Sequence, residues 1–255
     1  MAGPWRIGEL SNYVTNDYLF EIPSDWAAVH APGKRLATGR FRDGRWGGLG
    51  PALVAYEPPN EGNPPKPNAT IERVKPLILY GVPRPGVVEL EVSDDRKMKS
   101  FSEPDDWTAG AWLTAGDQAA VVLIGTKARG RSWYGFSNGA GFATSNDPND
   151  PVPEVPPFPH DSRGYWSEEI AAQILFFDPN DLAAVAEGKA DSWQPQPYAT
   201  LDIDQHLFDP GYDHERYKRY PVGAAAFDRA RGILYIIERR ADEERSVIHV
   251  FKIGK

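Results

Sequence analysis

An internal repeat is the sequence feature that most constrains the fold. Residues 18–29 (YLFEIPSDWAAV) align with residues 174–185 (ILFFDPNDLAAV). Each stretch reads as a strand that ends at a proline turn, and a short helix follows at residues 24–30 and 180–188. A further strand is predicted after each helix. The repeat therefore predicts one strand–helix–strand unit, used twice, and elsewhere the chain shows only short apolar runs bounded by Gly, Pro, Asp or Asn.

A second repeated unit opens with a strand of small residues, at residues 50–54, 110–114 and 223–227. In two of these cases a hairpin turn leads into a strongly apolar strand, residues 119–126 or 233–238. Small inner strands are typical of propeller blades, because blades crowd around a central axis. We therefore predict an all-β fold, a β-propeller of four-stranded blades, with a β-sandwich as the alternative.

The whole chain, residues 1–255, is predicted to form this single domain. Its strands suffice for about three and a half blades, fewer than the four or more that normally close a ring. The ring is therefore either small and closed by the N-terminal strands, or incomplete. An incomplete ring exposes sheet edges, and in that case we expect a homo-oligomer.

The inner hairpin at residues 223–238 (GAAAFDRARGILYIIE) resembles hairpins of uncharacterised bacterial β-propeller proteins. Enzymes with this scaffold include glycoside hydrolases, polysaccharide lyases and calcium-dependent lactonases or phosphotriesterases. The resemblance is architectural and implies a site in the central funnel. It does not choose among these activities.

Composition excludes several classes of function. The net charge is −8 and the Lys and Arg residues are scattered, which argues against nucleic-acid binding. No apolar run is long enough for a membrane span, and the N-terminus has no signal peptide, so as written we expect a soluble, cytoplasmic chain. There is no cysteine, so any metal must be held by oxygen or imidazole ligands.

Long connections mark where a site would lie on a propeller. The connections at residues 42–48, 93–107 and 205–220 should meet at one mouth of the funnel. Residues 127–169 are predicted as a long loop insertion over that funnel. A small-molecule or glycan ligand is therefore expected there.

Our leading hypothesis is a hydrolase that acts on a carbohydrate, because aromatic residues alternate with carboxylates in these loops. The predicted catalytic residues are Asp106, Glu168 and His214. The predicted substrate-binding residues are aromatic, basic or imidazole side chains: Arg45, Trp46, Trp107, Trp133, Tyr134, His160, Arg163, Trp166, His206, Arg216 and Tyr217. The alternative for residues 105–107 is a turn whose Trp107 packs in the core.

Two other functions remain open. The first is a metal-dependent lactonase or phosphotriesterase; Asp147 and Asp150 lie in a loop whose oxygen ligands suit a calcium ion. The alternative to a calcium site at Asp147 and Asp150 is an ordinary Asx-turn loop. The second is a non-catalytic propeller that binds a glycan or a protein through the long insertion.

Overall fold

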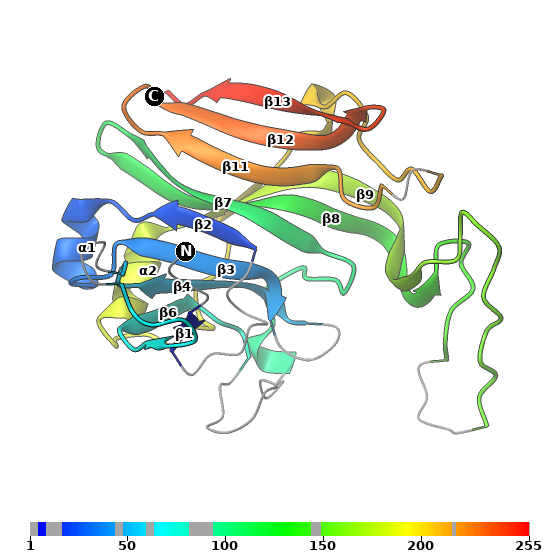
Figure 1. The fold of residues 1–255 in the computed structure, drawn as a ribbon, viewed down its shortest axis with the longest axis horizontal. Helices are drawn as coiled ribbons and strands as arrows, with labels where there is room; N and C mark the ends of the chain where they lie inside the picture. Colours follow the sequence, from blue (N-terminus) through cyan, green and yellow to red (C-terminus); the bar gives the residue numbers. More distant parts are fainter. Residues whose placement is uncertain are drawn as a thin grey trace.

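The chain is mostly β-structure. The computed structural model has 48% strand and 9% helix, so the predicted all-β class is confirmed. The strands form three antiparallel sheets and one short parallel pair (Figure 1). The structure describes residues 5–8, 17–43, 48–59, 64–81, 94–143, 149–215 and 218–254.

The N-terminal sheet has the strand order β2-β3-β4-β6. Its strands are β2 (Tyr18–Glu21), β3 (Leu36–Asp43), β4 (Gly50–Tyr56) and β6 (Val74–Ile78). The short parallel pair joins β1 (Arg6–Ile7) to β5 (Thr70–Ile71).

The central sheet has the order β10-β9-β8-β7, and the C-terminal sheet has the order β11-β12-β13. The central strands are β7 (Asp106–Ala115), β8 (Gln118–Phe136), β9 (Arg163–Phe177) and β10 (Ala199–Asp202). The C-terminal strands are β11 (Val222–Asp228), β12 (Ile233–Asp242) and β13 (Arg245–Lys252). Single 3-10 turns occupy Asp94–Arg96 and Asp204–His206.

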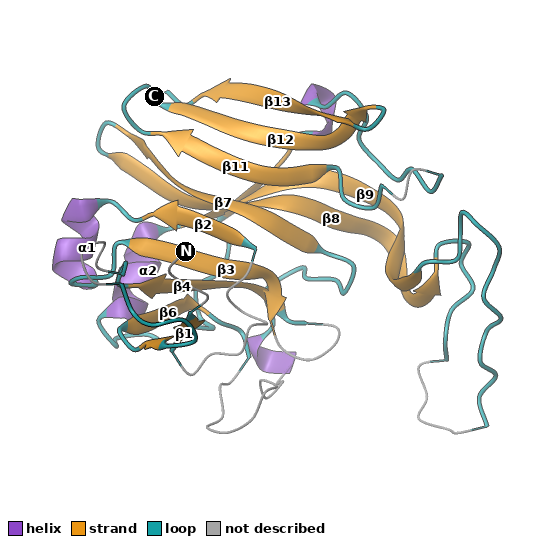
Figure 2. Cartoon of the chain, viewed as in Figure 1, coloured by secondary structure: helices purple, strands orange, loops and turns teal. Residues whose placement is uncertain are grey.

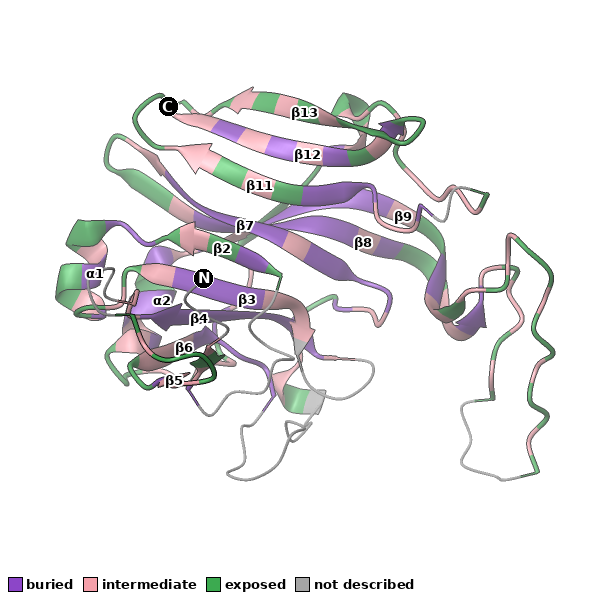
Figure 3. Cartoon of the chain, viewed as in Figure 1, coloured by how far each residue is buried: buried purple, intermediate pink, exposed green. Residues whose placement is uncertain are grey.

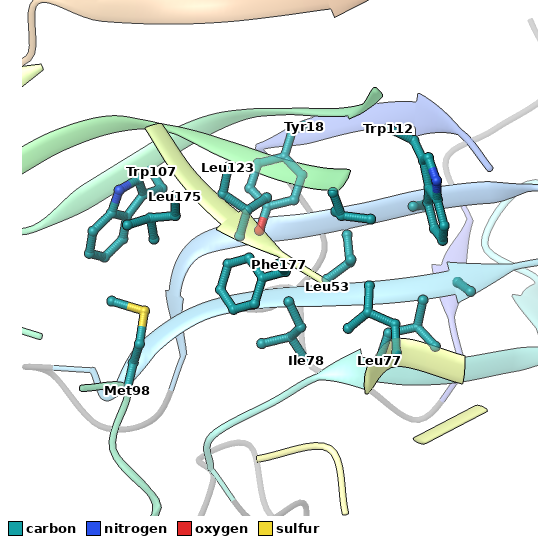
Figure 4. Packing of buried hydrophobic residues seen from close by; sticks show 14 of the residues in the cluster. Tyr18, Leu53, Leu77, Ile78, Met98, Trp107, Trp112, Leu123, Leu175 and Phe177 are labelled. Carbon is teal, nitrogen blue, oxygen red and sulfur yellow. The ribbon is translucent and has the colours of Figure 1, made fainter. Parts of the chain in front are cut away.

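The three sheets stack face to face, with the central sheet covered on both sides. Successive side chains of a strand point to opposite faces, and β8 uses both. Val121 and Leu123 pack with the N-terminal sheet, whereas Val122 and Ile124 pack with the C-terminal sheet. Figure 4 shows the first of these cores, which contains Leu123 of β8 and Leu53 of β4. Burial on both faces explains why residues 121–124 of β8 are apolar without alternation.

The repeated strand–helix–strand unit is confirmed. Helix α1 (Ser24–His30) lies between β2 and β3, and helix α2 (Pro179–Ala186) lies between β9 and β10 (Figure 2). In both units the flanking strands pair antiparallel. The helices also touch, since Trp26 Nε1 donates to the carbonyl of Pro179 at 3.2 Å.

The propeller itself is not supported, because no sheet arrangement in the described part of the chain closes into a ring. We predicted that residues 50–54 open a new blade as its inner strand. Instead β4 pairs with β3 in the same sheet, from Leu36 opposite Tyr56 to Arg40 opposite Ala52. The sheets consequently form layers, which is the packing of the alternative β-sandwich with a third sheet added.

The two ends of the predicted loop insertion at residues 127–169 are strands of a β-hairpin. Strand β8 continues to Phe136 and β9 begins at Arg163, so residues 137–162 lie outside these strands. Cross-strand aromatic pairs, Trp133 opposite Trp166 and Tyr134 opposite Tyr165, stabilise the extension.

Candidate functional site

The two aspartates before Trp107 play different parts. The buried carboxylate of Asp105 accepts hydrogen bonds from the backbone N–H groups of Ser102 and Ala128, at 2.9 and 2.8 Å, and from Lys127 Nζ at 2.8 Å. Burial raises the pKa of Asp105, and the charge of Lys127 opposes that rise. Asp105 is thus a satisfied group that ties the segment before β7 to β8.

Asp106 is buried but not satisfied. Its exposed fraction is 4%, and its Oδ1 atom has no hydrogen-bond partner among the residues that the structure describes. A bulge between Asp106 and Ala109 interrupts the pairing of β7 with β8. The neighbouring Trp107 is fully buried in the core of Figure 4, so it cannot be the exposed sugar platform that we predicted.

Three arginines act electrostatically on the Asp106 carboxyl group. Burial raises the pKa of Asp106 to about 7, while the charges of Arg42, Arg239 and Arg219 lower it and that of Asp17 raises it. At neutral pH the carboxyl group is therefore only about half ionised. The centre consequently carries excess positive charge.

The predicted meeting of three connections is seen in the residues that the structure describes. Arg42, in β3, donates from Nη1 to the carbonyl of Glu103 at 2.7 Å. Tyr220 precedes β11, and burial together with the charge of Asp106 raises its pKa to about 12. Arg42, Asp106 and Tyr220 come from the three connections and influence one another electrostatically.

A pocket of about 340 Å³ opens beside this centre, between the β8–β9 hairpin and the C-terminal sheet. Neither Arg219 nor Arg239 has an ion-pair partner within the described residues. The lining residues are Pro159, Ser162, Trp166, Asp213, His214, Lys218, Arg219, Tyr220, Arg239 and Arg240.

Aromatic rings form one wall of the pocket. The ring centroid of Trp166 lies 5.5 Å from Tyr212 and 5.6 Å from His214, and His160 lies 5.1 Å from His214. The guanidinium carbon of Arg219 lies 4.3 Å from the Trp166 centroid. Burial, followed by the charge of His160, lowers the pKa of His214. The predicted residues His160, Trp166 and His214 are thus brought together.

A buried polar network fixes the loop that carries these residues. The carboxylate of Glu238 accepts from the backbone N–H groups of Phe208 and Asp209, at 2.8 and 2.7 Å, and contacts His249 Nε2 at 2.7 Å. Lys218 Nζ bonds the carboxylate of Asp209 at 3.0 Å. The network connects the loop to β12 and β13, and so positions the residues that follow Lys218.

Two predicted residues lie away from this site. Glu168 is exposed; its carboxylate accepts from the backbone N–H of Arg131 at 2.9 Å, on the same hairpin. It is therefore not the partner of Asp106 in a buried carboxylate pair. His206 is exposed in a 3-10 turn, and its ring lies 5.7 Å from that of Phe251 in β13.

Three further predicted residues pack within the β8–β9 hairpin. Trp133 Nε1 donates to the carbonyl of Phe136 at 2.8 Å. The rings of Tyr134 and Tyr165 are 4.8 Å apart, and the guanidinium carbon of Arg163 lies 5.0 Å from the Tyr134 centroid. These contacts stabilise the hairpin that forms one side of the pocket.

The remaining predicted residues lie outside the described residues, apart from Asp150. Those outside are Arg45, Trp46, Arg216, Tyr217 and Asp147. Asp150 is half-buried, and in the described ranges no group of three or more His, Asp or Glu side chains is placed to hold a metal ion. Nor does any described helix have the length and hydropathy for crossing a membrane.

Our sequence analysis missed the basic residues of the pocket. Arg219 and Tyr220 belong to the connection that we singled out, but nothing in their spacing distinguishes them. Arg239 and Arg240 lie beyond the strand predicted at residues 233–238, and β12 continues through both to Asp242. Only the pairing of β12 with its neighbours places them at the pocket.

Comparisons with known proteins add no name to this site. Neither the protein-family models, nor the curated proteins, nor the solved structures contain a match to the chain. The functional argument therefore depends on the geometry of the pocket.

Proposed function

We propose that the protein binds an anionic, ring-containing small molecule, an acidic sugar, in the pocket between the β8–β9 hairpin and the C-terminal sheet. The observation that carries the proposal is the pair of pocket-lining guanidinium groups, Arg219 and Arg239, that lack a carboxylate partner among the described residues. Unpaired arginines are well suited to bind a carboxylate, often through two parallel hydrogen bonds.

The charge balance around Asp106 favours an anion. Three arginines and one other carboxylate, Asp17, act on the Asp106 carboxyl group, which is half neutral near pH 7. The arginines outnumber the carboxylates, so a bound carboxylate would offset the excess positive charge. Asp106 itself is sealed from solvent and does not line the pocket. Its ionisation determines how much of the positive charge of the arginines is offset.

The ring preference comes from the aromatic residues that line the pocket beside Arg219. Trp166, His214 and Tyr220 line the pocket, and aromatic rings pack well against the apolar face of a sugar. Asp213 and Ser162 supply polar groups for hydroxyls. A volume of about 340 Å³ is at the small end of the roughly 300–1,000 Å³ typical of ligand pockets, which favours a short ligand.

Calorimetric titration with glucuronate and with glucose tests the proposal. At low salt we expect glucuronate to bind more tightly than glucose, because only glucuronate carries a carboxylate. The Arg219→Gln variant should bind glucuronate about tenfold to a hundredfold more weakly, the effect of losing a charged hydrogen bond.

Arg231→Gln is the matched control. Arg231 is exposed in the β11–β12 turn and bonds Asp228 there at 2.8 Å, so its loss should leave glucuronate binding unchanged. Equal affinities for glucuronate and glucose would exclude a carboxylate site at Arg219. Equal losses of glucuronate affinity in Arg219→Gln and Arg231→Gln would exclude it as well.

A glycoside hydrolase is the second candidate, and the raised pKa of Asp106 favours it. A carboxyl group that keeps its proton near pH 7 has the property required of a general acid. The mechanism needs a second carboxylate within about 5–10 Å of the first. Glu168, predicted for that part, is exposed and bound to the Arg131 backbone. A hydrolase would therefore require Asp106 to become accessible when substrate binds.

Chromogenic glucoside and glucuronide substrates separate this candidate from simple binding. For a hydrolase that uses both carboxyl groups, Asp106→Asn and Glu168→Gln should each lose nearly all turnover while remaining folded. Turnover at the wild-type rate in both variants removes the idea. Binding of glucuronate without turnover by the wild-type protein favours the first proposal.

A further inference from the structure

A proline-rich arm projects from the hairpin that borders the pocket. We define the arm as residues 149–162, between β8 and β9. In Figure 1 this part of the chain extends well away from the three sheets. Five of its residues, Pro151, Pro153, Pro156, Pro157 and Pro159, fall within nine positions.

The sequence of the arm restricts its backbone almost completely. Proline fixes its own φ near −65° and holds the preceding residue in extended or polyproline II conformations. Within residues 151–159, only Glu154 is neither a proline nor followed by one. Residues 151–157 form neither helix nor strand (Figure 2). These constraints favour a polyproline II helix, which needs no internal hydrogen bonds.

Burial along the arm repeats every three residues, as a helix with three residues per turn requires. Pro153, Pro156 and Pro159 are the less exposed positions. The ridge beside them, Val152, Val155 and Phe158, is 75%, 69% and 58% exposed. Figure 3 shows the resulting change between intermediate and exposed residues along the arm. Val152 and Val155 therefore lie along one side of a stiff, projecting segment, and Phe158 follows in the turn that ends it.

We propose that this arm is a docking segment for a partner protein whose groove is lined with aromatic side chains. Such grooves bind polyproline II helices, because the ligand is already ordered and its apolar side chains fit between the rings. The arm offers two Val-Pro dipeptides three residues apart, Val152-Pro153 and Val155-Pro156. That spacing places both dipeptides on the same side of the helix.

The charge of the arm specifies the rim of the partner's groove. Asp150, Glu154 and Asp161 are acidic, and the arm contains no Lys or Arg. A groove with basic residues at its rim complements these carboxylates, whereas an acidic rim repels them. The partner is thus an aromatic groove flanked by cations.

The root of the arm is held in place, which lowers the conformational entropy that the arm loses when it binds a partner. Ser137 Oγ lies 2.8 Å from His160 Nδ1, and the N–H of Phe142 donates to the carbonyl of Tyr134 at 2.8 Å. Gly135 also bridges to Gly141. A fixed root and a stiff backbone leave little conformational entropy to be lost on docking.

The test titrates the whole protein with isolated SH3, WW and EVH1 domains chosen to differ in the charge of their groove rims. Domains whose groove rim is basic should bind the wild-type protein, and domains whose groove rim is acidic should not. Val152→Ser combined with Val155→Ser should weaken that binding about tenfold or more, because it removes both apolar anchors.

Val29→Ser is the matched control. Val29 is 69% exposed on α1, as exposed as Val155, and its replacement should leave domain binding unchanged. The proposal is overturned if no basic-rimmed domain binds, or if the double variant binds as well as the wild type. It is also overturned if the double variant only converts a wild-type oligomer to a monomer, since the arm would then contact a second copy of this chain.

Discussion

At the scale of single residues, Asp106 is a buried acidic group whose hydrogen-bonding capacity is not fully satisfied among the described residues. Its carboxyl group is buried, one oxygen has no hydrogen-bond partner among the described residues, and its neighbours are guanidinium groups. Burying an unsatisfied polar group costs stability unless another role compensates. The pocket beside it supplies such a role, because the charge of Asp106 sets the charge balance of Arg219 and Arg239.

We predict that Asp106 makes stability fall as pH rises. Its folded pKa of about 7 lies above the ordinary value of 3.8, so the folded protein holds this proton more tightly than the unfolded chain does. The resulting stabilisation is fully present below pH 3.8 and is lost as pH rises through about 7, at up to about 1.4 kcal/mol per unit. Asp106→Asn should therefore stabilise the protein more at pH 8 than at pH 5, in urea denaturation at both values.

Asp25→Asn provides the comparison for this measurement. Asp25 is exposed on α1, so its replacement removes a surface carboxylate and leaves the buried one in place. If Asp106→Asn changes stability equally at pH 5 and pH 8, the Asp106 carboxyl group of the wild-type protein does not titrate between these two pH values.

At the scale of elements, the bulge in β7 depends on a glycine in the neighbouring strand. A Cβ atom on Gly125 of β8 would lie 2.0 Å from the carbonyl oxygen of Asp106 and 2.5 Å from the Cα of Trp107. Both neighbours are backbone atoms, which cannot move without shifting the strand. The absence of a side chain at Gly125 therefore permits the backbone of β7 at Asp106 and Trp107 to lie close against β8.

We predict that Gly125→Ala destabilises the protein by about 1–3 kcal/mol or more, the cost of overpacking a dense interior. Urea denaturation measures the loss. Gly254→Ala should have little effect, because a Cβ atom there meets nothing within 4 Å. Equal stability of both variants would mean that β7 and β8 can separate freely at the bulge.

At the scale of the whole molecule, the C-terminal sheet supports the pocket through Glu238. This residue is fully buried in β12 and holds the loop that leads to Arg219. We predict that Glu238→Ala costs about 3–5 kcal/mol, since it breaks a buried polar network and leaves Lys218 with fewer partners. Thermal or urea denaturation measures this loss, and glucuronate affinity should fall with it.

Glu244→Ala is the surface counterpart. Its side chain is 75% exposed beside Arg240, and such pairs contribute about 0–1 kcal/mol. A similar small effect for Glu238→Ala would show that the loop is held by other contacts.

The candidate site could be predicted in part. Asp106, His160, Trp166 and His214 were identified because acidic, aromatic and imidazole side chains in long connections stand out in a sequence. Arg219 and Arg239 were missed, because an arginine at a pocket looks the same in sequence as an arginine in solvent. Trp107 was predicted to bind substrate, with packing in the core as the alternative, and the alternative is confirmed. A bulge beside it decides which way its ring faces.

What the sequence determined by itself was local. Turn residues, short apolar runs and the repeat at residues 18–29 and 174–185 predicted nearly every described strand and both helices, because backbone preference acts over a few neighbours. Only the tertiary structure decided which strands share a sheet and which sheets face each other. Period-two alternation says that a strand has two faces, but the energy of covering each face comes from distant residues. A strand such as β4 could therefore join β3 instead of opening a new blade.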